Sequence, residues 1–222
     1  MQTLGHLRRS LLALGVLAIA FVVLSAGVSA GQLKGVDHQV ASTMTEIWRP
    51  QLKLPMQAIA LLGGVEVTTL VALGLFIYIR RQGFRSEAWA LLAYPLAQLI
   101  ELVYKRLVFQ PGPPPSIQHG DAPSLTWLLG GSVISNSFPS GHMLRTVLVY
   151  GLLAFVVVRM SERPAVRRWA VPAAVVLCVA MAFDRVYLNV HWESDVLGGA
   201  LLGALALAGA IIWLDRPRGV VA

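Results

Sequence analysis

Residues 11–28, LLALGVLAIAFVVLSAGV, contain no charged side chain. An apolar helix needs roughly 20 residues to cross the hydrocarbon core of a bilayer, so this segment predicts a membrane span. The whole chain has a similar character, because 56% of its 222 residues are hydrophobic and only 13% are charged. Soluble domains are about 25% charged. We therefore expect an integral membrane protein, and the composition excludes a disordered chain or a repeat solenoid.

Five more apolar segments follow the first one. The predicted fold class is an all-α membrane protein, a bundle of six transmembrane helices that forms one domain over residues 1–222. Between the first two spans we expect an outer loop with a short surface helix, and residues 109–138 form the longest outer connection. The predicted spans cover residues 11–28, 56–79, 88–104, 143–158, 171–189 and 196–214.

The arginines predict how this bundle is oriented. Cytoplasmic loops of membrane proteins carry an excess of Lys and Arg, so both termini are expected in the cytoplasm. The net charge of +7 is then an orientation signal, and we expect no nucleic-acid partner. The Ala- and Arg-rich composition indicates a bacterial plasma membrane. The arginines on the predicted cytoplasmic side are Arg8, Arg9, Arg80, Arg81, Arg85, Arg159, Arg163, Arg167, Arg168, Arg216 and Arg218.

A cleaved signal peptide is the alternative interpretation of the first apolar segment. Val28-Ser29-Ala30 is an acceptable cleavage site. The segment is longer than the apolar core of about 7–15 residues that signal peptides have, so an uncleaved span is favoured. Cleavage would leave the orientation of every later span unchanged. The single cysteine, Cys178, excludes a disulfide framework and a Cys-based zinc site.

Ionisable residues from three distant segments are predicted to meet at the outer face. Lys105 ends the third span, residues 139–142 (Pro-Ser-Gly-His) open the fourth, and residues 184–195 connect the fifth to the sixth. Charged residues such as Asp184 and Arg185 inside a span are costly, and they indicate a functional site by default. The outer end of the bundle is therefore the predicted site.

The first group of these residues suits an anion. Ser140 and Gly141 lie where a helix begins, and the free backbone N–H groups and the dipole of a helix N-terminus favour negative charge. Lys105 and Arg185 add cations that suit phosphate oxygens.

The second group suits proton and phosphoryl transfer. His191 and Asp195 are four residues apart, so the carboxylate can orient the imidazole and make His191 a nucleophile. His142 lies beside the anion pocket and can transfer a proton. Together these residues predict phosphoryl transfer through a phosphohistidine, with no metal ligand and no cofactor.

These residues resemble the membrane-integrated type-2 phosphatidic acid phosphatases, whose sites are related to those of acid phosphatases and vanadium haloperoxidases. The family has three blocks, Lys-x6-Arg-Pro, Pro-Ser-Gly-His and Ser-Arg-x5-His-x3-Asp. The second block is intact at residues 139–142. In the third, Arg185, His191 and Asp195 fall at the family spacing, with Asp184 in place of Ser. The resemblance covers roughly residues 54–214.

The resemblance implies a six-helix fold and an activity. The implied enzyme hydrolyses a lipid phosphate or a polyprenyl diphosphate at the outer leaflet. His191 would attack phosphorus, Asp195 would orient His191, and His142 would protonate the leaving oxygen. The phosphoryl oxygens would be held by Lys105, Ser140, Gly141 and Arg185.

The first block departs from the family pattern. Lys105 and Pro113 remain, but the two positions at which the family has Arg hold Gln110 and Gly112. Arg145 lies about one helical turn past His142, and we hypothesise that it replaces the missing guanidinium.

Other interpretations of the same residues stay open. Lys105 could pair with Glu101, four residues earlier on a helix. Arg185 could pair with Asp184 or Asp195, and Ser140 could be a helix N-cap. The alternative function is a catalytically impaired relative that binds or transports a phosphorylated lipid. A non-enzymatic membrane scaffold is a third possibility, and the sequence leaves the lipid and the oligomeric state open.

Overall fold

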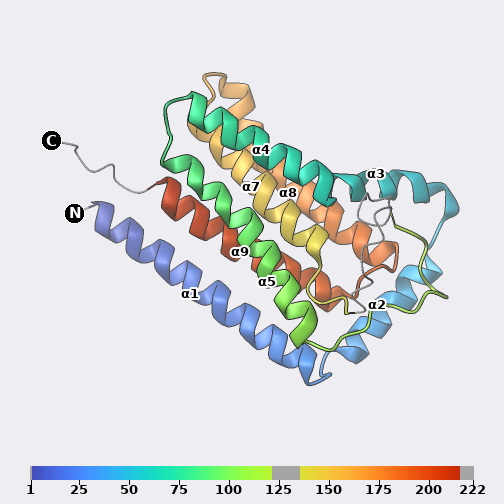
Figure 1. Ribbon diagram of the computed structural model, residues 1–222. Helices are drawn as coiled ribbons and strands as arrows, with labels where there is room; N and C mark the ends of the chain where they lie inside the picture. The colour runs from blue at the N-terminus through green and yellow to red at the C-terminus, as the bar shows by residue number, and fades with distance from the viewer. Residues whose placement is uncertain (1, 122–135, 216–222) are drawn as a thin grey trace.

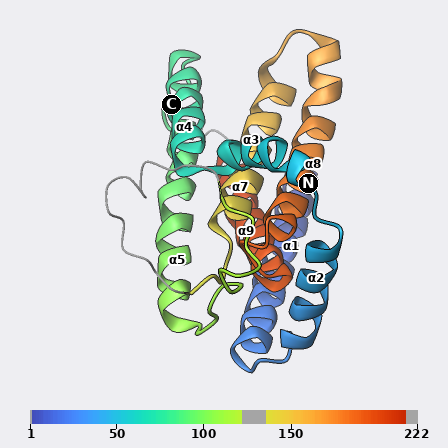
Figure 2. The same ribbon diagram turned by 90° about the vertical axis from the view of Figure 1, so that its right-hand side faces the viewer.

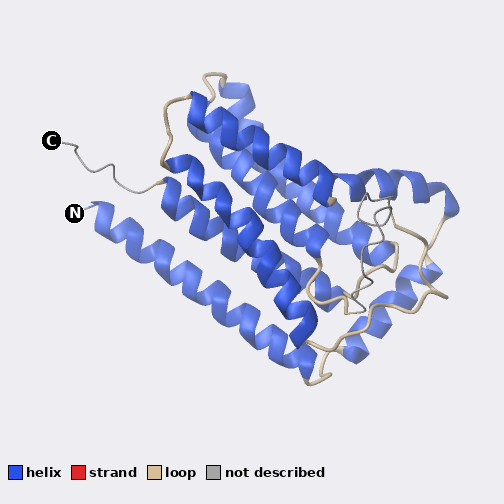
Figure 3. Cartoon of the chain, viewed as in Figure 1, coloured by secondary structure: helices blue, strands red, loops and turns tan. Residues whose placement is uncertain are grey.

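The computed structural model describes residues 2–121 and 136–215, and the regular elements in these ranges are helices (Figure 3). The predicted all-α class is therefore confirmed. Two short 3-10 helices, η1 (Pro50–Leu52) and η2 (Glu87–Leu92), each lead into an α-helix. The α-helices are α1 (Gln2–Ser29), α2 (Lys34–Glu46), α3 (Lys53–Gly63), α4 (Val65–Arg81), α5 (Ala93–Leu107), α7 (Gly141–Met160), α8 (Pro164–Tyr187) and α9 (Glu193–Leu214).

In the described part of the chain, four helices are long and apolar enough to cross a membrane. They lie in α1, α7, α8 and α9, and a bent pair of segments, Pro50–Gly63 and Val65–Arg81, would give a fifth span. The predicted second span at residues 56–79 is not one continuous helix, because the chain bends by 42° between these two segments. The predicted third span at residues 88–104 begins as η2, and α5 itself has only 15 residues. The count of six spans stays a prediction.

The break between α3 and α4 is stabilised by side chains of α7. Gly64 has an extended backbone conformation, with φ −61° and ψ 152°. Carbonyl groups in the last turn of a helix lack intrahelical partners. Arg145 Nε donates to the Gly63 carbonyl at 3.0 Å, and the Tyr150 hydroxyl donates to the Leu62 carbonyl at 2.8 Å. The bend therefore leaves few carbonyl groups without a hydrogen-bond partner. It directs α3 across the end of the bundle (Figure 1).

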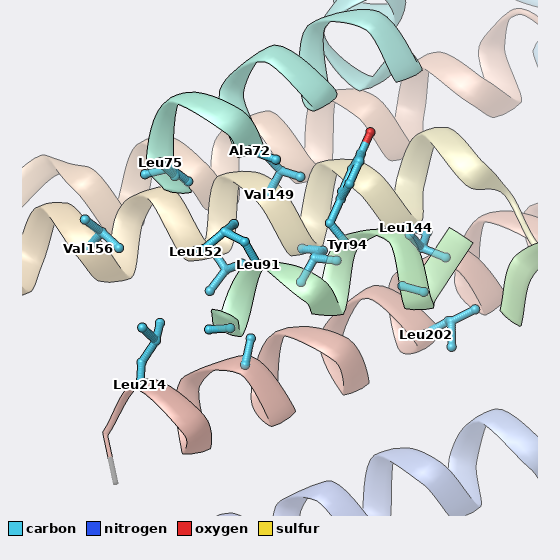
Figure 4. Packing of buried hydrophobic residues seen from close by; sticks show 14 of the residues in the cluster. Ala72, Leu75, Leu91, Tyr94, Leu144, Val149, Leu152, Val156, Leu202 and Leu214 are labelled. Atoms are coloured by element: carbon cyan, nitrogen blue, oxygen red, sulfur yellow. The ribbon is translucent and has the colours of Figure 1, made fainter. Parts of the chain in front are cut away.

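The helix α7 lies at the centre of the bundle, between α8 and α9 (Figure 1). Its apolar side chains pack against α4, η2, α5 and α9 (Figure 4). The peripheral helices instead expose apolar residues, such as Val16 of α1 at 67% and Val176 of α8 at 68%. An apolar surface of this kind suits contact with lipid. The largest completely buried apolar side chains of α7 are Leu144, Leu148, Val149 and Leu152.

The two ends of the bundle differ in structure. The start of α1 and the end of α9 lie at the same end, which is the arrangement that an even number of spans produces (Figure 1). At the opposite end, α2 and α3 lie next to the connection between α8 and α9 (Figures 1 and 2). The predicted short helix between the first two spans is α2, which packs against α8 and α9.

Candidate active site

The N-termini of α7 and α9 meet at the end of the bundle that carries α2 and α3. The backbone N–H of Ser140, just before α7, donates to the carbonyl of Asp195 in the first turn of α9 at 2.9 Å. This bond joins the second sequence block directly to the third. Gly141 follows, and a methyl group at this position would overlap the Glu101 carboxylate of α5. Glycine therefore lets the Glu101 carboxylate lie directly against the start of α7.

The Ser140 side chain differs from the predicted N-cap. Its hydroxyl makes no capping hydrogen bond to α7, although the residue occupies the N-cap position. Ser140 is completely buried, and no described residue is a hydrogen-bond partner of its Oγ. A buried hydroxyl normally has a partner. Together with the free N–H groups at the start of α7, this hydroxyl is suited to binding an anion.

His191 and Asp195 are held together by the turn that connects α8 to α9. The His191 Nδ1 lies 3.3 Å from Asp195 Oδ2, which also accepts a hydrogen bond from the backbone N–H of Trp192 at 2.9 Å. Asp195 is completely buried, whereas the His191 side chain is 13% exposed. The carboxylate thus fixes Nδ1 and the plane of the imidazole, and Nε2 is the nitrogen that can react.

Arg185 is completely buried among carboxylates. Its Nε donates to Asp184 Oδ2 at 2.7 Å, and its Nη1 donates to both oxygens of Asp121 at 2.9 and 3.0 Å. The expected pairing of Arg185 with Asp184 is therefore present in the structure. Asp121 belongs to the connection that follows α5, and its side chain is 40% exposed. A solvent-accessible carboxylate thus contacts one edge of a buried guanidinium.

A second group of charges surrounds Glu101. Lys105 Nζ lies 3.2 Å from Glu101 Oε1, so the suggested pair along α5 is present. Arg145 Nη1 lies 3.7 Å from Glu101 Oε2. Because Glu101 also lies against Gly141, it holds both cations near the start of α7.

His142 lies among these groups. Its imidazole interacts electrostatically with Arg185, Arg145, His191 and Lys105. The structure therefore brings the candidate residues from all three sequence blocks to one end of the bundle. The three cations and the helix N-terminus can bind an anion. The two histidines, one of them oriented by a carboxylate, can transfer a proton.

Two contacts of this site were not predicted from the sequence. One is the contact of Asp121 with Arg185. The other joins Ser194 to Asp37 of α2: the Ser194 backbone N–H donates to Asp37 at 2.9 Å and its hydroxyl donates at 2.8 Å. Burial raises the pKa of Asp37, and the two hydrogen bonds from Ser194 oppose this rise. The only sequence signal for Asp37 was an acidic residue in a surface helix, which is common and uninformative.

Known proteins resemble this chain in sequence and in fold. The chain is 26% identical over 201 residues to phosphatidylglycerophosphatase B of Bacillus subtilis, covering 85% of this chain and 88% of that protein. It is 32% identical over 133 residues to decaprenylphosphoryl-5-phosphoribose phosphatase of Mycobacterium tuberculosis, 60% of each chain. The crystal structure of a transmembrane PAP2-type phosphatidylglycerolphosphate phosphatase from Bacillus subtilis superposes with a TM-score of 0.71 at 26% identity, covering 87% of this chain and 92% of that one. Residues 86–218 match the PAP2 superfamily, and this chain belongs to that family.

Proposed function

We propose that this phosphoric ester hydrolase is a lipid phosphatase that hydrolyses a phosphomonoester or a diphosphate at the outer leaflet. The proposal rests mainly on the contact between His191 and the buried carboxylate of Asp195, beside the N-terminus of α7. Such a pair suits nucleophilic catalysis and has no evident use in a protein that only binds lipid. The relatives named above act, by their names, on phosphorylated lipids, which supports a lipid substrate.

The chemistry proceeds in two steps. The His191 Nε2 attacks phosphorus in line, the bond from phosphorus to the leaving oxygen breaks, and His142 gives its proton to that oxygen. Water then attacks the phosphohistidine, His142 takes a proton from the water, and His191 and inorganic phosphate are released. Asp195 keeps the His191 ring oriented and stabilises its positive charge in both steps. The phosphoryl oxygens are bound by Lys105, Ser140, Gly141, Arg185 and Arg145.

In the proposed membrane arrangement, residues 1–222 form one domain that crosses a bacterial plasma membrane six times. The bent pair α3–α4 supplies the second crossing, and η2 with α5 supplies the third. The arginine distribution assigns the end that carries both termini to the cytoplasm. The site at the other end then faces the periplasm or the exterior.

A substrate panel tests the proposed function. Purified protein in detergent micelles is incubated with phosphatidic acid, phosphatidylglycerol phosphate or a polyprenyl diphosphate, and inorganic phosphate is measured. We expect release from at least one of these lipids without added divalent metal. A wild-type protein that binds these lipids but releases no phosphate would instead support the alternative, a binding or transport protein.

Replacing Asp121 with asparagine is expected to lower KM about two- to fivefold. The Asp121 carboxylate competes with the phosphoryl group for Arg185, and the variant removes this competitor. The size follows from the strength of partly exposed ion pairs, which are worth up to about 1 kcal/mol. The value of kcat should change little. Asp215→Asn is the matched control, because Asp215 pairs with Arg159 near the end of α9, far from the site. A rise in KM for Asp121→Asn, with the control unchanged, would contradict this expectation.

Replacing Arg145 with alanine is expected to lower kcat/KM about tenfold or more, if this residue compensates for the missing family arginine. Arg145→Lys should retain part of the activity because it keeps the charge. Tyr150→Phe is the control for structural damage, since Tyr150 also supports the α3–α4 break but carries no charge. Unchanged turnover in Arg145→Ala would refute the compensation.

A further inference from the structure

The side chain of Gln110 contacts the carboxylate that orients His191. Its Nε2 donates to Asp195 Oδ1 at 2.9 Å and to Ser194 Oγ at 2.9 Å. An amide nitrogen carries two hydrogens, so it can make both contacts at once. An ionised carboxylate only accepts hydrogen bonds, which fixes the amide with its nitrogen toward Asp195. Gln110 occupies one of the two positions where the family pattern has Arg, yet it contacts the catalytic carboxylate.

The second partner of Gln110 is itself held in one orientation. The Ser194 hydroxyl donates to Asp37 Oδ2 at 2.8 Å, and the Ser194 backbone N–H donates to Asp37 Oδ1 at 2.9 Å. Since the hydroxyl hydrogen points to Asp37, the Ser194 oxygen is left to accept from Gln110. Ser194 is 2% and Asp37 is 5% exposed, so water competes little for these bonds.

The backbone of Gln110 is fixed as well. Its carbonyl accepts hydrogen bonds from the Ser137 backbone N–H at 2.8 Å and from the Ser137 hydroxyl at 3.1 Å. Ser137 lies just before α7, whereas Gln110 lies just after α5. The amide is therefore placed against Asp195 by two segments that are distant in the sequence.

Both oxygens of Asp195 are used by this arrangement. Oδ2 contacts His191 and the Trp192 backbone N–H, and Oδ1 accepts the bond from Gln110. A completely buried carboxylate that loses a donor cannot replace it readily with water, so it reorients or stays unsatisfied. Reorientation of Asp195 would move the oxygen that contacts His191 Nδ1.

We propose that Gln110, held by Ser194 and Asp37, is a positioning residue for the Asp195–His191 pair and does not bind the phosphoryl group. This proposal rests on the proposed function. It explains how this position can hold Gln where the family pattern has Arg and still keep His191 oriented. The neutral Gln110 amide donates a hydrogen bond to Asp195 and adds no positive charge beside it.

The test compares Gln110→Ala with Gln118→Ala on phosphatidylglycerol phosphate in mixed micelles. Gln118 belongs to the same connection, but its amide donates to the Pro113 carbonyl. A hydrogen bond to a charged group is worth enough to change a rate about tenfold to a hundredfold, so kcat of Gln110→Ala should fall by that factor with KM nearly unchanged. Gln118→Ala should keep both constants. A raised KM with unchanged kcat in Gln110→Ala, or an equal loss in Gln118→Ala, would overturn the proposal.

A double substitution tests the role of Ser194. Ser194→Ala should lower kcat less than Gln110→Ala does, because Gln110 keeps its contact with Asp195. The double variant Gln110→Ala, Ser194→Ala should be no worse than Gln110→Ala alone, since Ser194 acts through Gln110. Additive losses of kcat would overturn the proposal that Ser194 acts through Gln110.

The failure of the proposed function gives a different result, because His191→Ala would then retain activity. If His191→Ala is inactive and Gln110→Ala changes only KM, the positioning role alone is refuted.

Discussion

His191→Ala is expected to lower phosphate release by at least on the order of 10³-fold, because removal of a catalytic nucleophile eliminates the covalent path. The contact of His191 Nδ1 with the buried Asp195 at 3.3 Å is the reason for choosing this histidine as the nucleophile. The loss should appear in kcat, while lipid binding through the cations and the start of α7 persists.

The phosphohistidine itself can be measured. Wild-type protein mixed with a lipid that carries a radioactive phosphate, and quenched in alkali, should retain label on the protein, whereas His191→Ala should retain none. His38→Ala is the matched control, because His38 lies on the surface helix α2 and stacks on Trp192 at 5.0 Å. Its turnover should stay within about twofold of the wild type, as surface substitutions usually do. Activity or label that survives in His191→Ala would exclude the assigned nucleophile.

The long apolar helices were the part of the fold that the sequence predicted well. Residues 11–28, 143–158 and 196–214 lie inside α1, α7 and α9, because an uninterrupted apolar segment of this length has few other stable conformations. The fifth predicted span, residues 171–189, lies mostly in α8, which begins earlier, at Pro164. Proline is favoured at the first turn of a helix, so the sequence carried a signal for this start.

The bend at Gly64 could not be predicted from the apolar pattern. Residues 56–79 are mostly apolar on both sides of Gly63-Gly64 and Glu66, and glycine is tolerated in membrane helices. The break depends on donors from α7, Arg145 and Tyr150, which are distant in the sequence. The hydropathy of one segment contains no information about hydrogen-bond donors on another helix.

The position of the site and its short-range pairs, such as Lys105 with Glu101, could be predicted, but the contacts made by the connection after α5 could not. Counting spans placed Lys105, His142 and His191 at one end of the bundle, and electrostatic interactions of His142 with the other two agree with this placement. The contacts of Asp121 and Gln110 depend on a connection without helical or strand periodicity. Side-chain partners in such a connection follow from three-dimensional packing, which a linear pattern does not specify.

Gly199→Ala is expected to damage both stability and activity, because α9 packs against the start of α7 at this residue. A methyl group at Gly199 would overlap the Ser140 carbonyl oxygen and would lie 3.1 Å from Met143 Cβ. The Ser140 carbonyl is backbone and accepts the bond from Leu144 N at 3.1 Å, so it cannot rotate away as a side chain could. The helices must move apart instead.

The size of the effect follows from two opposing contributions. Overpacking costs about 1–3 kcal/mol, whereas alanine is favoured over glycine in a helix by about 1 kcal/mol. Gly209→Ala isolates the second contribution, because a methyl group at Gly209, also in α9, has no atom within 4 Å. We therefore expect a lower thermal unfolding midpoint for Gly199→Ala in detergent micelles and an equal or higher midpoint for Gly209→Ala.

Turnover should distinguish the two glycine variants even more clearly. The bond from Ser140 N to the Asp195 carbonyl crosses the same interface, so separation of α7 from α9 also separates Ser140, Gly141 and His142 from His191. A misplacement of about 1 Å between reacting groups can cost about 10²-fold in rate, and we expect a loss of this order for Gly199→Ala. Gly209→Ala should keep wild-type turnover. Equal midpoints and equal turnover for the two variants would mean that the close approach of α9 to α7 does not position the catalytic residues.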